Sequence, residues 1–405
     1  MRIRTFQGLR PVPERAAQVA SLPYDVVTTS EARRIAAGNP LSFLHVVRAE
    51  IDLPEGAGPY APEVYDTARR NLRRLETEGA LVREEYPCMY VYQLQMDRHV
   101  QRGLVCLCHI EDYENNLIRK HEKTRPQKED DRTTLNRTLR AHPGPVFLTY
   151  RDAPPVQPLL ESAASDAPLI DFTASDEVRH TVWRVAQPSP FIEAFSRIPF
   201  TYVADGHHRS ASAARVGAEC RAANPAHTGR EDYNWFLAVH FPASQLQILP
   251  YNRLVTDLNR HSPESFLAAL RELARVTPGA DPSPPGPGHV SMFMAGRWYG
   301  LAFPTPPAAD PVARLDVALL QDRVLDPLLD IGDPRTSDRI EFIGGIRGTG
   351  ELETRVNQRH DAVAFSMFPA TVEQLITIAD ANAVMPPKST WFEPKLRSGL
   401  FVHTF

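Results

Sequence analysis

One proline- and glycine-rich stretch constrains the fold of this chain more than any other part of it. The stretch reads TPGADPSPPGPG and runs from Thr277 to Gly288. Such a density of proline and glycine prevents regular secondary structure and favours an extended connector. We therefore expect a domain boundary here, followed by a C-terminal α/β region over residues 289–405.

The chain before this connector mixes helix-like and strand-like patterns. Apolar residues at helical spacing predict a helix over 63–79, and two β-rich runs, 88–96 and 102–110, predict a hairpin. A short apolar run at 200–204 predicts a strand, which is followed by a helical pattern that begins near 207. Because helices and strands intermingle, the predicted fold class is α/β, of the mixed α+β kind.

The length of 405 residues allows two or three domains. We expect an N-terminal α/β region over 1–114 and a catalytic core over 115–276, in addition to the C-terminal region. The net charge of −4 and the lack of a basic stripe argue against a nucleic-acid partner. No apolar run approaches the roughly 18 residues needed to span a membrane, and the first residues lack the apolar core of a secretory signal. We expect a cytoplasmic protein, and we leave a homodimer open.

Two of the four cysteines lie in one strand-like run, GLVCLCHI. Cys106 and Cys108 are two residues apart, so both side chains are expected on the same face of the strand. A zinc site would need two further ligands, and the chain has no second pair of closely spaced cysteines. Buried thiols in a core strand are therefore the favoured interpretation.

The strongest candidate site is the sequence ADGHHR, which follows the strand predicted at 200–204. Gly206 permits a sharp turn from Asp205 into a helix, and the first amides of a helix form an anion site. His207, His208 and Arg209 would add donors there, and Asp205 would bind a metal or accept a proton. The alternative is that Asp205 only caps the helix, but capping does not explain cations in the first turn, where the helix dipole disfavours them.

Three further segments carry candidate residues. RKHEKTRPQKEDDR places Glu122 among cations, which keeps a carboxylate ionised and suits a base or a metal ligand, although a solvated charge run is the simpler interpretation. MPPKSTWFEPKL forms a rigid loop with phosphate-type donors, and GGIRG is a glycine-rich turn; neither is a P-loop or a dinucleotide fingerprint. The candidate substrate- or phosphate-binding residues from these segments and from the run PYDVV are His121, Lys388, Ser389, Thr390, Lys395, Arg347 and Asp25.

Taken together and in order, PYDVV, RKHEKT, ADGHHR, GGIRG and MPPKSTWFEPKL resemble a prokaryotic family known only as domain of unknown function one thousand and fifteen. The pairing of His121-Glu122 with the later ADGHHR is more distantly similar to free serine kinases of the ParB/sulfiredoxin-like fold. That second resemblance implies a ParB/sulfiredoxin-like core with additional N- and C-terminal α/β elements. It also implies that Glu122 is the base on the acceptor hydroxyl and that the turn from Asp205 to Arg209 handles nucleotide phosphates and Mg²⁺.

The leading functional hypothesis is a nucleotide-dependent kinase that uses ATP or ADP with Mg²⁺ to phosphorylate a small molecule. A free amino acid such as serine is the expected acceptor. Phosphoryl transfer needs positioning and charge neutralisation more than a special nucleophile, which fits the residue types of these segments. Two alternatives stay open at this point: a ParB-like nucleotide-binding regulatory module, and a metal-dependent hydrolase that uses Asp205, His207 and His208.

Overall fold

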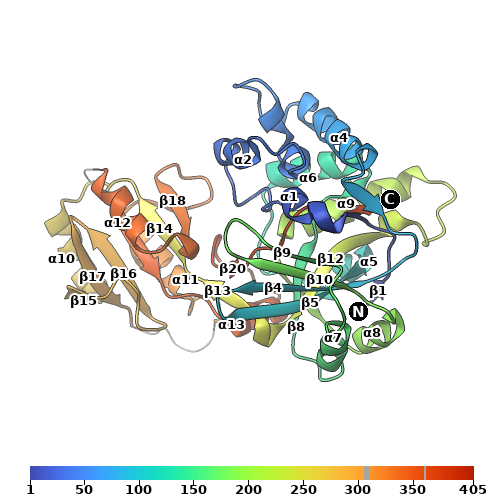
Figure 1. Cartoon of the computed structure of the whole chain (residues 1–405). Coiled ribbons are helices and arrows are strands. Elements are labelled where there is room, and N and C mark those ends of the chain that lie inside the picture. Colours follow the sequence, from blue (N-terminus) through green and yellow to red (C-terminus); the bar gives the residue numbers. More distant parts are fainter. Residues whose placement is uncertain (305–309, 360–361) are drawn as a thin grey trace. The chain divides into compact units, whose positions relative to one another are not determined.

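The computed structural model describes residues 1–304, 310–359 and 362–405. The chain forms two compact units, each of which mixes helices and strands (Figure 1), so the predicted α/β class is confirmed. The first unit comprises Met1–Lys120, Thr124–Leu246 and Pro394–Phe405, and the second comprises His121–Lys123 and Gln247–Glu393. Within the described part of the chain, no helix is both long enough and apolar enough to cross a membrane.

A nine-stranded mixed sheet forms the centre of the first unit. Its strand order is β6-β11-β8-β12-β5-β4-β10-β9, with β1 paired to β5 at the side. The pairs β11–β6 and β12–β8 are parallel and the other pairs are antiparallel. The strands are β1 (Ile3–Arg4), β4 (Tyr90–Met96), β5 (His99–His109), β6 (Ile118–Arg119), β8 (Val146–Tyr150), β9 (Ile170–Thr173), β10 (Arg179–Arg184), β11 (Thr201–Asp205) and β12 (Trp235–Pro242).

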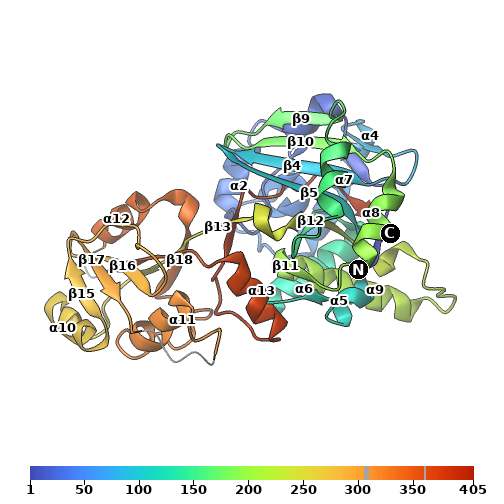
Figure 2. The same ribbon diagram turned by 90° about the horizontal axis from the view of Figure 1, so that it is seen from below.

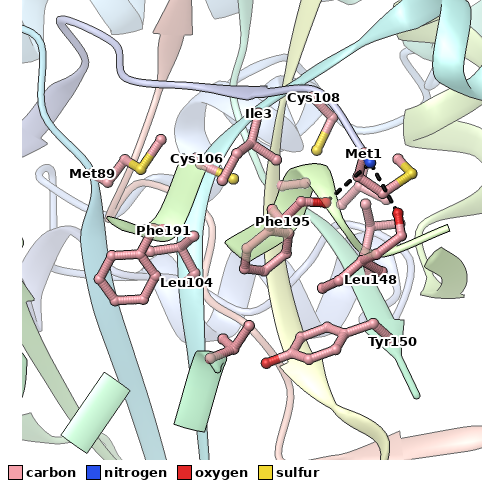
Figure 3. Packing of buried hydrophobic residues seen from close by; sticks show 14 of the residues in the cluster. Met1, Ile3, Met89, Leu104, Cys106, Cys108, Leu148, Tyr150, Phe191 and Phe195 are labelled. Atoms are coloured by element: carbon pink, nitrogen blue, oxygen red, sulfur yellow. Dashed lines mark hydrogen bonds between the residues drawn. The ribbon is translucent and has the colours of Figure 1, made fainter. Parts of the chain in front are cut away.

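Helices cover both faces of this sheet. Figure 1 shows α7 and α8 below the sheet and α4 and α6 above it. The helices of this unit are α1 (Ala16–Val19), α2 (Thr29–Ala36), α3 (Leu44–Val47), α4 (Pro62–Thr77), α5 (Ile110–Glu114), α6 (Pro126–Leu139), α7 (Val156–Ala163), α8 (Pro188–Ser196) and α9 (His207–Ala223). Figure 3 shows part of the core, where Phe191 and Phe195 of α8 pack with Leu104 and Cys106 of β5.

Several local predictions are confirmed in this unit. The hairpin predicted from 88–96 and 102–110 is formed by β4 and β5, in which Met96 pairs with His99. The helix predicted over 63–79 is α4. The run at 200–204 is β11, and the helical pattern after it is α9. Cys106 and Cys108 are fully buried free thiols, as the strand pattern predicted.

The second unit is built on a six-stranded antiparallel sheet with the order β15-β17-β16-β19-β14-β18. Figure 2 labels β15, β16, β17 and β18 of this sheet. A small pair, β13 (Gln247–Leu249) and β20 (Trp391–Glu393), opens and closes its main segment. The strands of the larger sheet are β14 (Tyr251–Val255), β15 (Arg275–Pro278), β16 (His289–Met294), β17 (Arg297–Ala302), β18 (Ile340–Gly344) and β19 (Val363–Met367). The helices are α10 (Pro263–Leu273), α11 (Asp316–Leu320), α12 (Gly350–Asn357) and α13 (Val372–Asp380).

The proline- and glycine-rich stretch lies inside this second unit, which differs from the expected boundary. It connects β15 to β16, and both of these strands pair with β17. Thr277 and Pro278 still belong to β15, and residues 279–288 form no helix or strand, as their composition predicts. Local composition does not determine whether the flanking strands join the same sheet. Along the chain, the boundary between the long segments of the two units instead falls between Leu246 and Gln247.

The last residues of the chain belong to the first unit rather than to the expected C-terminal region. Ser398 exchanges backbone hydrogen bonds with Ser21, and Val402 exchanges them with Leu9. β21 (His403–Thr404) pairs with β7 (Ala141–His142), while β2 (Leu9–Pro11) pairs with β3 (Leu81–Arg83). The tail that begins at Pro394 therefore completes the unit that contains the ADGHHR turn.

Candidate active site

The turn between β11 and α9 contains the ADGHHR residues singled out in the sequence. Asp205 is the last residue of β11, and Gly206 is the N-cap of α9 with φ 97° and ψ 33°. This left-handed conformation favours glycine. Because the N-cap residue is a glycine, its own side chain contributes no cap to the helix. The first amides of α9 have no intrahelical acceptors and point toward the turn.

Asp205 holds two cationic side chains at this turn. Its Oδ2 atom lies 3.3 Å from Arg209 Nη2 and 3.8 Å from Lys395 Nζ. The Asp205 side chain is 26% exposed, whereas that of Lys395 is only 8% exposed. The tail therefore brings a buried cation to the turn, and two of the residues singled out in the sequence meet within the first unit.

Arg209 and His208 also make contacts that stabilise the turn. The Arg209 guanidinium folds back over Gly206 and donates to the carbonyl of Pro145, just before β8. His208 Nε2 accepts a hydrogen bond from the backbone N–H of Arg125, at a distance of 3.0 Å. Arg125 is the N-cap of α6, so His208 ties the start of that helix to the turn.

His207 is buried and neutral at ordinary pH. The pKa of its imidazole is lowered to about 3, mainly by burial; Asp205 opposes this shift, and His208, Arg209 and Lys120 add to it. His207 therefore offers hydrogen bonding, not positive charge. A histidine that stays uncharged at the first turn of a helix also removes part of the conflict with the helix dipole.

Lys120 is a residue of this site that the sequence did not single out. Its Nζ atom donates to the carbonyl of Tyr113 at 3.1 Å and lies 4.2 Å from the centre of the Tyr113 ring. Burial lowers the pKa of this lysine. Because Lys120 stands in the charged run RKHEK, the sequence alone gave no means of telling it apart from solvated neighbours.

The remaining candidates are divided between the two units. Asp25 is an exposed residue of the first unit; burial raises the pKa of the neighbouring Tyr24 hydroxyl, Asp25 adds to this shift, and Arg209 opposes it. The candidates in the second unit are His121, Glu122, Arg347, Lys388, Ser389 and Thr390.

In the second unit, the loop that contains Lys388 has a defined conformation. Lys388 has φ 59°, which is unusual for a residue with a side chain. Ser389 Oγ donates to the carbonyl of Pro386 at 2.5 Å. The backbone N–H of Met385 donates to the carbonyl of His121 at 2.8 Å, so the short segment His121–Lys123 is attached to this loop. Arg347, by contrast, lies exposed in the GGIRG turn.

The two core cysteines have a third neighbour that the sequence did not reveal. Cys108 Sγ lies 3.0 Å from Nε2 of His240, which comes from β12. Cys106, Cys108 and His240 are all fully buried. Burial raises the pKa of the Cys108 thiol well above its usual value, so it stays protonated and hydrogen-bonds within the core.

Comparison with protein families identifies the family of the chain. A family model described as "Protein of unknown function (DUF1015)" matches residues 3–318. No curated protein matches the chain.

Among solved structures, the chain is similar to a free serine kinase variant in complex with AMP, with 11% identity, a TM-score of 0.38, and coverage of 71% of this chain and 87% of the other. It is also similar to a C-terminally truncated SbnI from Staphylococcus aureus, with 12% identity, a TM-score of 0.38, and coverage of 71% and 82%. A conserved hypothetical protein from Pyrococcus furiosus has 12% identity, a TM-score of 0.36, and coverage of 73% and 93%. Because these scores are low, inferences about the reaction rest on the residues of this chain alone.

Proposed function

The chain belongs to the DUF1015 family, which carries no assigned reaction, and from the residues of the first unit we propose that it is a nucleotide-dependent phosphotransferase. It transfers a phosphoryl group from ATP or ADP to the hydroxyl of a small molecule, with a free amino acid such as L-serine as the expected acceptor. The proposal includes a ParB/sulfiredoxin-like assignment for the core of the first unit.

The start of α9 at Gly206, beside the buried cation Lys395, is the observation that carries this proposal. Helix-terminal amides bind phosphate oxygens, and Gly206 lets the backbone approach them closely. Lys395 adds a positive charge at the same turn, 3.8 Å from Asp205. In this proposal Lys395 and the first-turn amides neutralise phosphate charge, and His208 and Arg209 contact the phosphates while their present hydrogen bonds hold the turn in shape.

A magnesium ion fits the residues of this turn. Mg²⁺ that accompanies nucleotide phosphates is usually held by one or two carboxylates together with phosphate oxygens and waters. Asp205 offers one partly exposed carboxylate at the turn, and phosphate oxygens would also attract the two cations beside it, Arg209 and Lys395. When bound, the ion supplies charge neutralisation at the phosphates.

We assign the role of base to Glu122. Lys120 and Thr124, which flank the segment His121–Lys123, both belong to the first unit. Successive Cα atoms are about 3.8 Å apart, so the Glu122 Cα stays within about 7.6 Å of each of those two Cα atoms. Arg125, three residues after Glu122, donates to His208 of the turn. The chain itself thus keeps Glu122 near the unit that binds the phosphates.

The chemical step follows from these roles. The hydroxyl oxygen of the acceptor attacks the terminal phosphorus, and the bond from that phosphorus to the leaving nucleotide oxygen breaks. The hydroxyl proton passes to the Glu122 carboxylate. Lys395 and the amides of α9 stabilise the charge on the phosphate oxygens throughout. Neutral His207 donates or accepts a hydrogen bond without adding charge.

The test is direct. Purified protein is incubated with Mg²⁺, either ATP or ADP, and a panel of amino acids and small alcohols, and phosphorylated products are identified by mass spectrometry. We expect nucleotide consumption that depends on the acceptor, with phosphoserine as the main product. Asp205→Asn should abolish most of it, while Glu219→Gln, at the exposed end of the same helix, should not. If no member of the panel causes nucleotide consumption, the proposal fails.

A further inference from the structure

The second unit contains a cavity of about 300 Å³, a size suited to a small molecule. Its walls come from β14, β18, α11 and the chain after it, and the Pro386-Pro387 pair. Figure 2 shows β18 and α11 in this unit. Val317, Leu325 and Phe342 give the cavity apolar walls, and Arg253, Asp333 and Arg335 are its charged groups.

Arg253 is buried in an unusual way. Its side chain is 3% exposed, and it donates to the backbone carbonyls of Tyr251 and, at 3.1 Å, Lys388. The pKa of its guanidinium is lowered to about 10 by burial, and Tyr251 opposes this shift. None of these partners carries a formal negative charge at neutral pH.

The other buried cations of the described chain have carboxylate partners. Arg132 pairs with Asp131, Arg397 with Asp176, and Lys395 with Asp205. Among the residues that the structure describes, no carboxylate lies within ion-pair distance of Arg253. An isolated buried charge is strongly unfavourable unless an opposite charge compensates it, and backbone carbonyl dipoles compensate it only in part.

The charge of the cavity indicates what kind of ligand would compensate Arg253. Arg335 is paired with Asp333 at 2.8 Å, so these two side chains contribute no net charge. Arg253 leaves one net positive charge, which matches a singly charged group better than a nucleotide polyphosphate. A carboxylate also matches the planar fork of a guanidinium.

The backbone next to the cavity is also strained. Lys388, whose carbonyl accepts from Arg253, has the left-handed φ of 59°. A residue other than glycine adopts this conformation at a cost in free energy. Such residues are found where the surrounding structure enforces the conformation, often at ligand sites. Arg253 is therefore the group that joins the strained loop to the cavity.

We propose that this cavity binds a small organic acid whose carboxylate is held by Arg253. The site is derived from the second unit alone and does not depend on the phosphotransfer assigned to the first unit. Apolar walls accommodate the carbon skeleton of the ligand, and Asp333 offers an acceptor for an ammonium group, so an amino acid is one member of the expected class.

The experiment measures ligand binding to the full chain by calorimetry and thermal stabilisation, without nucleotide. The probes are L-serine, L-lactate, ethanolamine and inorganic phosphate. We expect L-serine or L-lactate to bind, whereas ethanolamine, which lacks a carboxylate, should not. Loss of a buried charged contact predicts at least ~30-fold weaker binding in Arg253→Met. Arg253→Lys, which keeps the charge, should retain part of the affinity.

Arg275→Met is the matched control, because Arg275 is an exposed arginine of the same sheet, on β15. It should bind as the unchanged protein does. The proposal is overturned if no carboxylate binds, if phosphate alone binds, or if carboxylates bind Arg253→Met with unchanged affinity. Carboxylate binding that depends on Arg253, in a protein without phosphotransfer activity, would support this site and reject only the proposed reaction.

Discussion

Lys395 Nζ lies 3.8 Å from Asp205 Oδ2, which joins the C-terminal tail of the first unit to the turn that begins α9. Lys395 is buried, so it needs a partner of opposite charge at all times. Asp205 fills that role in the present structure. Phosphate oxygens would be a stronger partner, and their arrival would leave the Asp205 carboxylate available for Mg²⁺.

Replacing Lys395 should therefore weaken nucleotide binding. A hydrogen bond to a charged group contributes about 1.5–3 kcal/mol, so Lys395→Met should raise the dissociation constant of ADP or ATP by ~10- to 100-fold. Titration calorimetry measures this constant. Lys128→Met, on α6 and beside Tyr60, is the control and should bind nucleotide normally. If both variants bind nucleotide as tightly as the unchanged protein, Lys395 does not contact the phosphates.

Replacing Glu122 should affect the reaction rate without affecting binding. A general base contributes typically ~10²–10⁴ to the rate, so Glu122→Gln should lower kcat by that factor. Nucleotide affinity and thermal stability should stay near those of the unchanged protein. Glu114→Gln, which alters an exposed glutamate paired with Arg221, serves as the control. A normal kcat in Glu122→Gln would require another base, with Asp205 as the next candidate.

Replacing Gly206 should damage the turn itself. A side-chain residue in the left-handed region costs about 1–2 kcal/mol, and a Cβ at Gly206 would also lie 2.9 Å from Arg209 Nε. Gly206→Ala should lower the free energy of unfolding and weaken nucleotide binding. Gly229→Ala is a matched control, since Gly229 has φ 85° but open space around its Cβ position. It should lose stability through the backbone alone and keep its nucleotide affinity.

His207 should make the stability of the first unit depend on pH. Its pKa is about 3 in the folded state, below the value near 6.5 of an unfolded histidine. Between these values the unfolded chain binds the extra proton, so stability falls as pH decreases from 6.5 toward 3, by up to about 1.4 kcal/mol per pH unit from this group.

Urea unfolding between pH 7 and pH 5, followed in His207→Gln, tests this dependence. The variant should lose less stability than the unchanged protein as the pH falls. His142 and His180 also have pKa values that burial lowers, so part of the dependence should persist. His289→Gln, a change in a partly exposed histidine of the second unit, should leave the pH dependence of stability unchanged. If the unfolding free energy of His207→Gln falls with pH as steeply as that of the unchanged protein, the His207 imidazole is not held in its neutral form in the folded state.

Features that depend on neighbouring residues were predictable from the sequence. Strand alternation identified β4 and β5 and placed Cys106 and Cys108 on one face. The order of a strand, a glycine and a helical pattern identified the turn at Gly206, because few other residues adopt its φ of 97°. In both cases the physical cause, side-chain periodicity or backbone sterics, acts over a few residues.

The same local reasoning did not determine the partners of charged groups. In the charged run that contains Lys120 and Glu122, the sequence does not show which side chains are buried. The structure shows that Lys120 is half-buried against Tyr113. The identity of the buried cations, and whether a carboxylate reaches them, depends on how segments distant in the sequence pack. Arg253 could not be distinguished from an ordinary strand arginine without its surroundings.

The sequence by itself therefore determined the α/β class, the principal hairpin and the turn from Asp205 to Arg209. Only the tertiary structure decided that residues 277–288 connect two strands of the same sheet. It also decided that the C-terminal tail places Lys395 beside Asp205, and that Arg253 is buried beside a cavity. Dihedral preferences and side-chain periodicity are properties of short segments. Burial and charge compensation are properties of contacts between segments, and they exist only once the chain has folded.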